Sequence, residues 1–175
     1  MKLFGKWRKD SAPAEADAAF DQSSAAPSAT RQDPSLGQNR KILVVDDNSV
    51  VLKAFELKLK ALGFEVITAN DGSAAVSIAR QERPDLIVLD VNFPPDVGNS
   101  GLQWDGFNIM QWMRRFQEAV NIPVIIITSG DPAKLKEKAM ASGAVAFFQK
   151  PINHEEFLIT VRRTLGQAAT KPQTA

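Results

Sequence analysis

The chain has 175 residues, 44% of them hydrophobic, which is enough for one domain with its own core and some length left over. Its 21 basic and 20 acidic side chains leave no charge excess of the kind that marks a nucleic-acid-binding domain, and the absence of cysteine excludes disulfides and thiolate metal sites. No apolar stretch approaches the roughly 20 residues that cross a bilayer and no secretory signal is present, so we expect a cytoplasmic protein that binds no nucleic acid.

Residues 1–40 are predicted to form a disordered N-terminal tail. From Ser11 to about Asn39 the sequence is dominated by Ala, Ser, Asp, Gln and Pro, with Phe20 and Leu36 as its only large apolar residues. Such a segment buries too little surface to offset the entropy lost on ordering.

The first ten residues carry a weaker signal. Leu3, Phe4 and Trp7 fall on one face of a helix beside several basic side chains, as in a short membrane-surface or partner-binding peptide. The segment is too short to anchor firmly, and a disordered terminus is the alternative. Membrane contact by residues 1–10 therefore stays open.

After Lys41, short apolar runs alternate with stretches of helical periodicity. The runs predict strands at residues 42–45, 66–69, 86–90, 124–128 and 146–148. Helices are predicted from about residue 52 to 62 and at about 72–82, 105–118, 132–142 and 153–165. Gly63 is a good C-terminal stop for the first helix, and Asn153 with Glu156 resembles a capping box at the start of the last.

This alternation predicts an α/β fold, a parallel sheet with helices on both faces, because right-handed crossovers require that layering. A flavodoxin-like (βα)5 doubly wound arrangement, with strand order 2-1-3-4-5, would make the third strand central. The domain is expected to span residues 41–166. Residues 167–175 are too few and too polar to fold separately and are predicted to be a second disordered tail.

Polar side chains stand at the carboxyl ends of the predicted strands, where open parallel sheets bind their ligands. They are Asp46, Asp47, Asp90, Thr128 and Lys150. Clustered carboxylates would raise one another's pKa unless a cation is shared among them, and Mg²⁺ prefers such oxygen ligands. An ammonium and a hydroxyl could bind phosphoryl oxygens, and a central carboxylate can attack phosphorus to give an aspartyl phosphate.

These residues resemble the receiver domains of bacterial two-component response regulators. The matching positions are the acidic pair Asp46 and Asp47, Asp90 in LIVLDVNFP, Thr128 in VIIITSG and Lys150 in FFQKP, and the resemblance covers residues 41–166. It implies that Asp90 is the phosphoacceptor, and that Mg²⁺ is held by Asp46, Asp47, Asp90 and the backbone carbonyl of Asn92. It also implies that Thr128 and Phe147 form a switch pair and that the Lys150–Pro151 bond is cis.

By this resemblance the chain is a single-domain response regulator that receives a phosphoryl group on Asp90 from a histidine kinase or a histidine phosphotransfer protein. The downstream protein would bind the fourth helix, fifth strand and fifth helix. Such a chain is not an enzyme beyond its own Mg²⁺-dependent phosphorylation and dephosphorylation. The alternative is a phosphorylation-independent adaptor with the same fold. An enzyme of nucleotide or phosphate-ester chemistry is disfavoured, since VVDDNS lacks phosphate-cradling glycines.

One departure from the family is the connection after Asp90. Asp105 and Gly106, which resemble the pair that opens the third helix, come only after FPPDVGNSGLQW, so the connection is roughly eight residues longer than usual. The extended loop 95–104 is either passive, anchored by Trp104, or a gate for the phosphodonor or partner.

Two further features are given ordinary interpretations. His154, the only histidine, is predicted to be a solvated residue in the first turn of the last helix rather than a phosphoryl carrier. Lys134, Lys136 and Lys138 are predicted to form the solvent-exposed face of the fourth helix, where they could also contribute to docking.

Overall fold

In the computed structural model, residues 39–92 and 105–168 are described, all within one compact unit, Asp33–Ala175. The predictions for residues 1–38, for the extended loop with Trp104 and for residues 169–175 lie outside the described residues. Residues 167–168, predicted to begin the second tail, instead continue the last helix. Within the described ranges, no helix combines the length and the apolar composition that crossing a bilayer requires.

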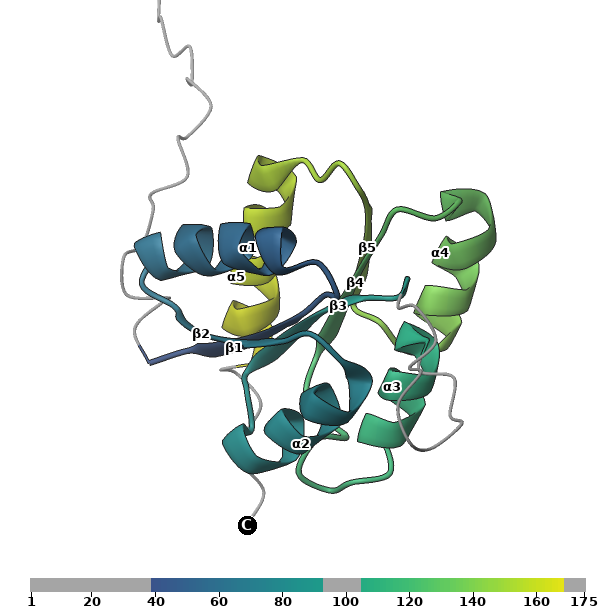
Figure 1. Ribbon diagram of the computed structural model, residues 1–175, viewed down its shortest axis with the longest axis horizontal. Coiled ribbons are helices and arrows are strands. Elements are labelled where there is room, and N and C mark those ends of the chain that lie inside the picture. Colours follow the sequence, from purple (N-terminus) through teal and green to yellow (C-terminus); the bar gives the residue numbers. More distant parts are fainter. Residues whose placement is uncertain (1–38, 93–104, 169–175) are drawn as a thin grey trace, which may run out of the picture. The chain divides into compact units, whose positions relative to one another are not determined.

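Five parallel strands form one sheet. In chain order they are β1 (Lys41–Val45), β2 (Glu65–Ala69), β3 (Leu86–Asp90), β4 (Val124–Thr128) and β5 (Ala146–Gln149). Their spatial order is β2-β1-β3-β4-β5, as predicted, with β3 in the centre (Figure 1). Because all the strands run in the same direction, their carboxyl ends lie along one edge of the sheet.

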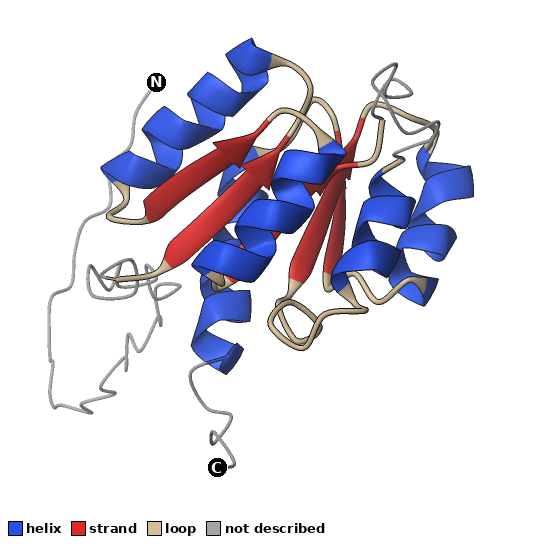
Figure 2. Ribbon diagram, turned by 60° about the horizontal axis from the view of Figure 1, so that its bottom comes forward, coloured by secondary structure: helices blue, strands red, loops and turns tan. Residues whose placement is uncertain are grey.

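A helix follows each strand. The helices are α1 (Ser49–Ala61), α2 (Gly72–Glu82), α3 (Gly106–Met113), α4 (Pro132–Ala141) and α5 (His154–Ala168). They cover both faces of the sheet (Figure 2). One core cluster joins the sheet to α1 and α5, and the other joins it to α2, α3 and α4. The doubly wound fold class is confirmed.

The two core clusters explain the continuous apolar run of the first strand. Leu43 and Val45 belong to the cluster with α2, α3 and α4, whereas Ile42 and Val44 belong to the cluster with α1 and α5. All four side chains are fully buried. Successive strand residues point to opposite faces, so a strand covered on both sides has no polar position until it ends.

The helix ends follow their sequence signals. Gly63 has φ +87°, and its N–H donates to the Lys60 carbonyl at 3.0 Å while the Phe64 N–H donates to the Leu59 carbonyl at 3.2 Å. This pair of bonds is a Schellman motif, which needs a left-handed residue and therefore favours glycine. At α5, Asn153 Oδ1 accepts from the Glu155 and Glu156 N–H groups at 3.1 and 3.3 Å, as its predicted capping role requires.

The third helix is shorter than predicted. Periodicity predicted residues 105–118, but α3 ends at Met113 and the chain continues in turns. Arg115 and Phe116 donate to carbonyls three residues back, not four. Phe116 packs against the core and carries the Arg80 guanidinium 4.1 Å above its ring. We attribute the early end of the helix to this tertiary packing, which outweighs the propensity of the segment.

Gly106 is fixed by a close approach of two backbones, and replacing it by alanine is expected to destabilise the fold. A Cβ there would lie 2.5 Å from Val91 Cα and 2.6 Å from the Asp90 carbonyl oxygen. Backbone atoms cannot turn aside as a side chain would, so we expect Gly106→Ala to lower the free energy of unfolding by about 1–3 kcal/mol. Urea denaturation would measure it, and an unchanged midpoint would contradict the close approach.

Gly166 provides the matched substitution with the opposite expected sign. It lies in α5, and a Cβ there would meet nothing within 4 Å. Alanine loses less backbone entropy than glycine on entering a helix, so Gly166→Ala should raise the free energy of unfolding by about 0.5–1 kcal/mol. The same denaturation experiment tests it, and a destabilised Gly166→Ala protein would show that α5 is not helical at this position.

Candidate functional site

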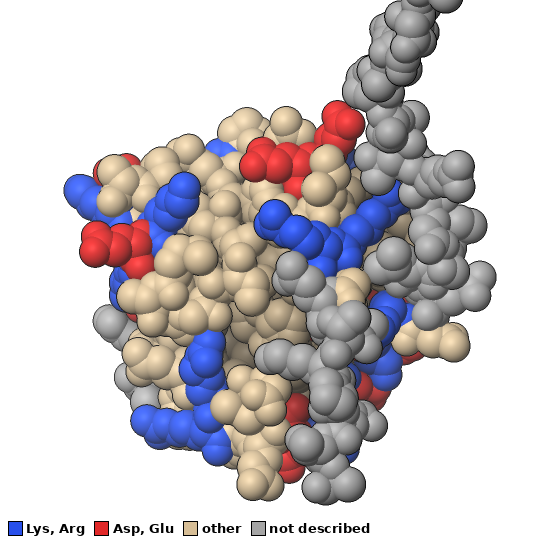
Figure 3. All heavy atoms as spheres, turned by 180° about the vertical axis from the view of Figure 1, so that it is seen from behind, with Lys and Arg blue, Asp and Glu red and all other residues tan. Residues whose placement is uncertain are grey.

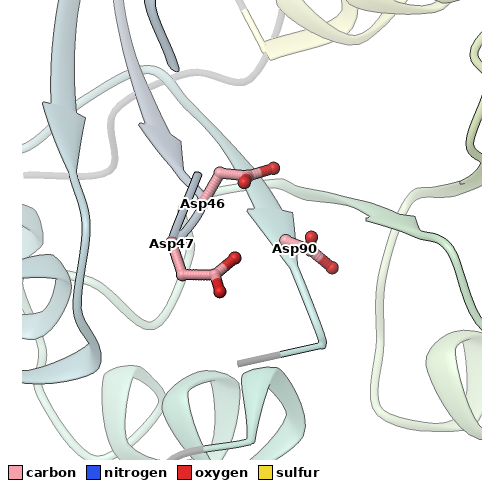
Figure 4. A group of neighbouring side chains, drawn as sticks. All are labelled: Asp46, Asp47 and Asp90. Atoms are coloured by element: carbon pink, nitrogen blue, oxygen red, sulfur yellow. The ribbon is translucent and has the colours of Figure 1, made fainter. Parts of the chain in front are cut away.

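Three carboxylates meet at the carboxyl edge of the sheet. Asp46 and Asp47 follow β1, and Asp90 ends the neighbouring strand β3. Figure 4 shows the three side chains close together beyond these strand ends. One oxygen from each lies within 4.8 Å of the others. The predicted convergence of the acidic residues is therefore present in the structure.

Lys150 links two of these carboxylates. Its Nζ donates to Asp46 Oδ2 at 2.6 Å and to Asp90 Oδ2 at 2.5 Å. Asp46 is fully buried and Asp90 is 2% exposed, so neither carboxylate obtains much help from water. The remaining oxygens accept backbone N–H groups, Asp46 from Asn48 at 2.9 Å and Asp90 from Asn92 at 2.8 Å. Both buried acids are thus paired and hydrogen-bonded, as buried charges must be.

The pKa shifts show how burial and pairing compete. Burial raises the pKa of Asp46 above its ordinary value of 3.8, and the hydrogen bond from Lys150 opposes that rise without cancelling it. Burial alone would lower the pKa of Lys150, but the hydrogen bonds to Asp46 and Asp90 outweigh burial, and the net shift is upward from 10.5. The ammonium of Lys150 is therefore charged at neutral pH.

The donor set fits a divalent cation. The three carboxylates and the single ammonium of Lys150 leave a formal charge of −2. Asp47 is exposed, and among the described residues its carboxylate has no hydrogen-bond or ion-pair partner. Oxygens bound to one Mg²⁺ lie about 3–4 Å apart, which small rotations of these side chains would supply. The three acids can therefore hold a metal ion whose charge balances their own.

Thr128 and Lys150 are brought together by the pairing of β4 with β5. The Lys150 N–H donates to the Thr128 carbonyl at 2.7 Å. Thr128 is fully buried, and its Oγ1 accepts the Gly130 N–H at 3.0 Å, which leaves the hydroxyl hydrogen to donate elsewhere. Phe147 lies in β5 opposite Ile126 and is half-buried. The two residues of the predicted switch pair thus lie on the paired strands β4 and β5, on one side of the central strand.

Asn92 ties the end of β3 to β4 through a contact that the sequence did not indicate. Its Nδ2 donates to Ser129 Oγ at 2.8 Å. At the other end of the extended connection, the Gly106 N–H donates to the Val91 carbonyl at 3.3 Å. The connection that leaves at Asn92 therefore returns beside Val91.

Gly130, two residues after Thr128, lies against α4. A Cβ on Gly130 would lie 2.5 Å from Leu135 Cδ1. Leu135 of α4 thus occupies the side that glycine leaves bare. The sequence does not predict the contact between Leu135 and Gly130, because that contact depends on where α4 packs.

The secondary predictions are met in part. The Lys150–Pro151 bond is cis. His154 is exposed at the first position of α5, as expected, but it also contacts Lys58. Lys134, Lys136 and Lys138 are exposed, and Lys138 lies 4.0 Å above the Phe107 ring, so it contacts α3 as well as solvent. Figure 3 shows basic and acidic side chains on the same face, in places next to one another and elsewhere with uncharged surface between them.

Comparison with known families agrees with this geometry. The family described as the response regulator receiver domain matches residues 42–162, which is most of the chain. The chain belongs to the response regulator receiver family. It is therefore a receiver-domain response regulator of two-component phosphorelay signalling. Receiver domains are phosphoacceptors rather than classical enzymes, and they receive the phosphoryl group from histidine kinases or phosphotransfer proteins.

Relatives of this receiver include a polar-differentiation response regulator, DivK, of Brucella anthropi. It is 30% identical over 129 residues, which are 74% of this chain and 98% of DivK. The solved chemotaxis protein CheY4 of Vibrio cholerae is 31% identical with a TM-score of 0.62 over 71% of this chain and 98% of its own.

A third relative is the receiver domain of the Pseudomonas aeruginosa sensor histidine kinase PA1611, solved with magnesium coordinated in its active-site cleft. It is 28% identical to this chain, and its TM-score is 0.63 over 73% of this chain and 98% of its own. Each relative is matched over nearly its whole length, so the similarity covers a complete receiver domain.

Proposed function

We propose that Asp90 accepts a phosphoryl group from a phosphohistidine of a histidine kinase or phosphotransfer protein in a Mg²⁺-dependent reaction. The observation that carries the proposal is the sharing of Lys150 by Asp46 and Asp90, within a cluster of three carboxylates at one strand edge. Asp90 is the member of that cluster on the central strand, and one ammonium already stands where negative charge would develop.

The transfer requires no further reactant. One carboxylate oxygen of Asp90 forms a bond to phosphorus while the bond between phosphorus and the donor's imidazole nitrogen breaks, and its electron pair stays on that nitrogen. The product is an aspartyl phosphate with charged oxygens at the rim of the sheet. Lys150 lies within hydrogen-bond distance of the attacking carboxylate, so its ammonium can donate to a phosphoryl oxygen once the phosphoryl group is on Asp90.

Asp46, Asp47, Asp90 and the Asn92 carbonyl would hold Mg²⁺, which supplies charge neutralisation for the equatorial oxygens of the transferring group. The fit of the donor set described above supports this, as does the magnesium ion reported for the receiver domain of PA1611. Asp47 is the exposed member of the set, so we expect it to be the carboxylate that exchanges solvent for the ion.

The hydroxyl of Thr128 and the ring of Phe147 would convert phosphorylation into a change of surface. Thr128 Oγ1 accepts the Gly130 N–H but retains its own hydrogen, which can turn to a phosphoryl oxygen. Phe147 is half-buried in the adjacent strand, so it has both core contacts and exposed area to exchange. A few kcal/mol of differential binding suffices to invert such a two-state population.

The output surface we propose is the face made by α4, β5 and α5. Met140 of α4 and Val145, which precedes β5, are 47% and 44% exposed. Lys136 is exposed four residues before Met140, so it lies on the same side of α4. A partner that covers these apolar side chains while pairing with Lys136 would sense movement of Phe147 in β5.

Acetyl phosphate and Mg²⁺ test the proposal without knowledge of the kinase. Mass spectrometry should show one added phosphoryl group, and addition of EDTA before the donor should abolish it. Partner capture with the phosphorylated and untreated protein should then differ. Absence of an adduct, or labelling that EDTA does not affect, would contradict the proposed site.

A further inference from the structure

An apolar groove lies between α1 and α5, and its larger part contains no residue of the carboxylate site. Its larger part is a cavity of about 320 Å³, with Phe55 and Leu59 of α1 and Phe157 and Leu158 of α5 among its lining residues. The two rings pack edge to face at 5.4 Å between centroids, and both line the cavity. Small-molecule sites have volumes of roughly 300–1,000 Å³ and mostly apolar walls, so this part lies at the lower end of that range.

A cationic side chain closes one end of this cavity. Lys58 Nζ lies 2.7 Å from His154 Nε2, and both residues line the larger cavity and also a second one of about 240 Å³. The two cavities therefore meet at this contact. Because an ammonium can only donate, Nε2 of His154 is the acceptor in this contact and its proton is on Nδ1.

The charge of Lys58 has no carboxylate partner among the described residues. Neither cavity has an acidic residue in its lining, and the charged side chains there are Lys58 and Lys150. The nearest acid along α1 is Glu56, whose two oxygens bind Lys53 at 2.8 Å and Lys60 at 2.7 Å. An apolar trough thus ends at a cation that lacks a counter-charge.

We propose that this groove binds an amphipathic carboxylate, a single aliphatic chain with one terminal acid. The chain would cover the two phenylalanine rings and replace water on the apolar walls, and the carboxylate would accept hydrogen bonds from Lys58. A helix that filled both cavities would have to break the Lys58–His154 contact between them. An aliphatic chain that fills only the larger cavity leaves this contact intact and places its terminal carboxylate beside Lys58. The proposal does not depend on phosphorylation of Asp90.

Titration of the full chain with decanoate below its micelle concentration tests the proposal. In ¹H–¹⁵N spectra, saturable shifts are expected for the amides of Leu59, Leu62 and Leu158, and titration with decanol should give weaker binding at the same amides. Lys58→Gln should weaken decanoate binding about three- to fivefold and leave decanol unaffected. Lys53→Gln, on the same helix but outside the groove, is the matched control and should change neither affinity.

A second variant separates binding from folding. Leu158→Trp fills the trough from α5 and should abolish decanoate binding while its spectrum keeps the wild-type dispersion. Unsaturable or scattered shifts would overturn the proposal, and so would equal losses of affinity in Lys58→Gln and Lys53→Gln. Shifts of the groove amides that depend on protein concentration without ligand would assign the groove to a second copy of the chain and also overturn it.

Discussion

Replacing Lys150 by methionine is expected to lower the free energy of unfolding by about 2–3 kcal/mol in the absence of metal. The substitution leaves two buried carboxylates, Asp46 and Asp90, without the cation they share. Breaking a fully buried ion pair costs about 3–5 kcal/mol, and the value here should be smaller because the Lys150 side chain is 22% exposed. Chemical denaturation in the presence of EDTA measures the difference.

The same variant reports on the metal site. Mg²⁺ bound to the acids replaces part of the missing charge, so it should stabilise Lys150→Met more than the wild type. Lys53→Met is the control, since Lys53 is 63% exposed and its ion pair among the described residues is with Glu56 alone, and its effect should be within about 0.5 kcal/mol. If Mg²⁺ stabilised neither protein, the acids would not form a cation site.

The loss in Lys150→Met has a defined pH dependence. The folded-state pKa of Lys150 is raised above 10.5, so its stabilising contribution is complete below that value. The contribution is lost only as the pH rises through the higher, folded-state pKa. On the alkaline side of neutrality, the stability difference between the wild type and the variant should therefore shrink only in strongly alkaline solution.

The second large effect is expected from Asp90→Asn. The amide retains an oxygen that can accept the Asn92 N–H but is no longer a nucleophile toward phosphorus. Labelling by acetyl phosphate and Mg²⁺ should fall to background, a loss of at least about a hundredfold. The variant should stay folded, since removing one of two buried acids leaves Lys150 paired with Asp46.

A matched control makes that loss specific. Asp131 caps α4 by accepting the Ala133 N–H at 3.0 Å, and asparagine caps a helix equally well, so Asp131→Asn should label as the wild type does. Full labelling of Asp90→Asn would place the phosphoryl group elsewhere. Full signalling by Asp90→Asn in cells would instead favour the phosphorylation-independent adaptor.

The strands and their ends were predictable because the signal is local. Ile42–Val45 and Val124–Thr128 are buried on both faces, so apolar runs identify them and the first polar residue marks the edge. Once the strands were parallel, Asp46, Asp90 and Lys150 had to share that edge whatever their separation in sequence. The site therefore followed from element order alone.

The remaining features depend on contacts between distant segments. The early end of α3, the packing of Leu135 beside Gly130 and the Asn92–Ser129 hydrogen bond each require knowing which surfaces meet. The resemblance places Gly106 at the start of the third helix, but it does not explain why glycine is required there. The structure does, because a Cβ at this position would lie 2.5 Å from the backbone of Val91.

Borohydride reduction is the most direct test of the central claim. An acyl phosphate is reduced to an alcohol, so an aspartyl phosphate at position 90 should appear as homoserine there after treatment with acetyl phosphate, Mg²⁺ and borohydride. The account predicts homoserine at position 90 alone, in proportion to the phosphoryl group bound. Homoserine at another aspartate, or a phosphorylated protein that yields none, would contradict it.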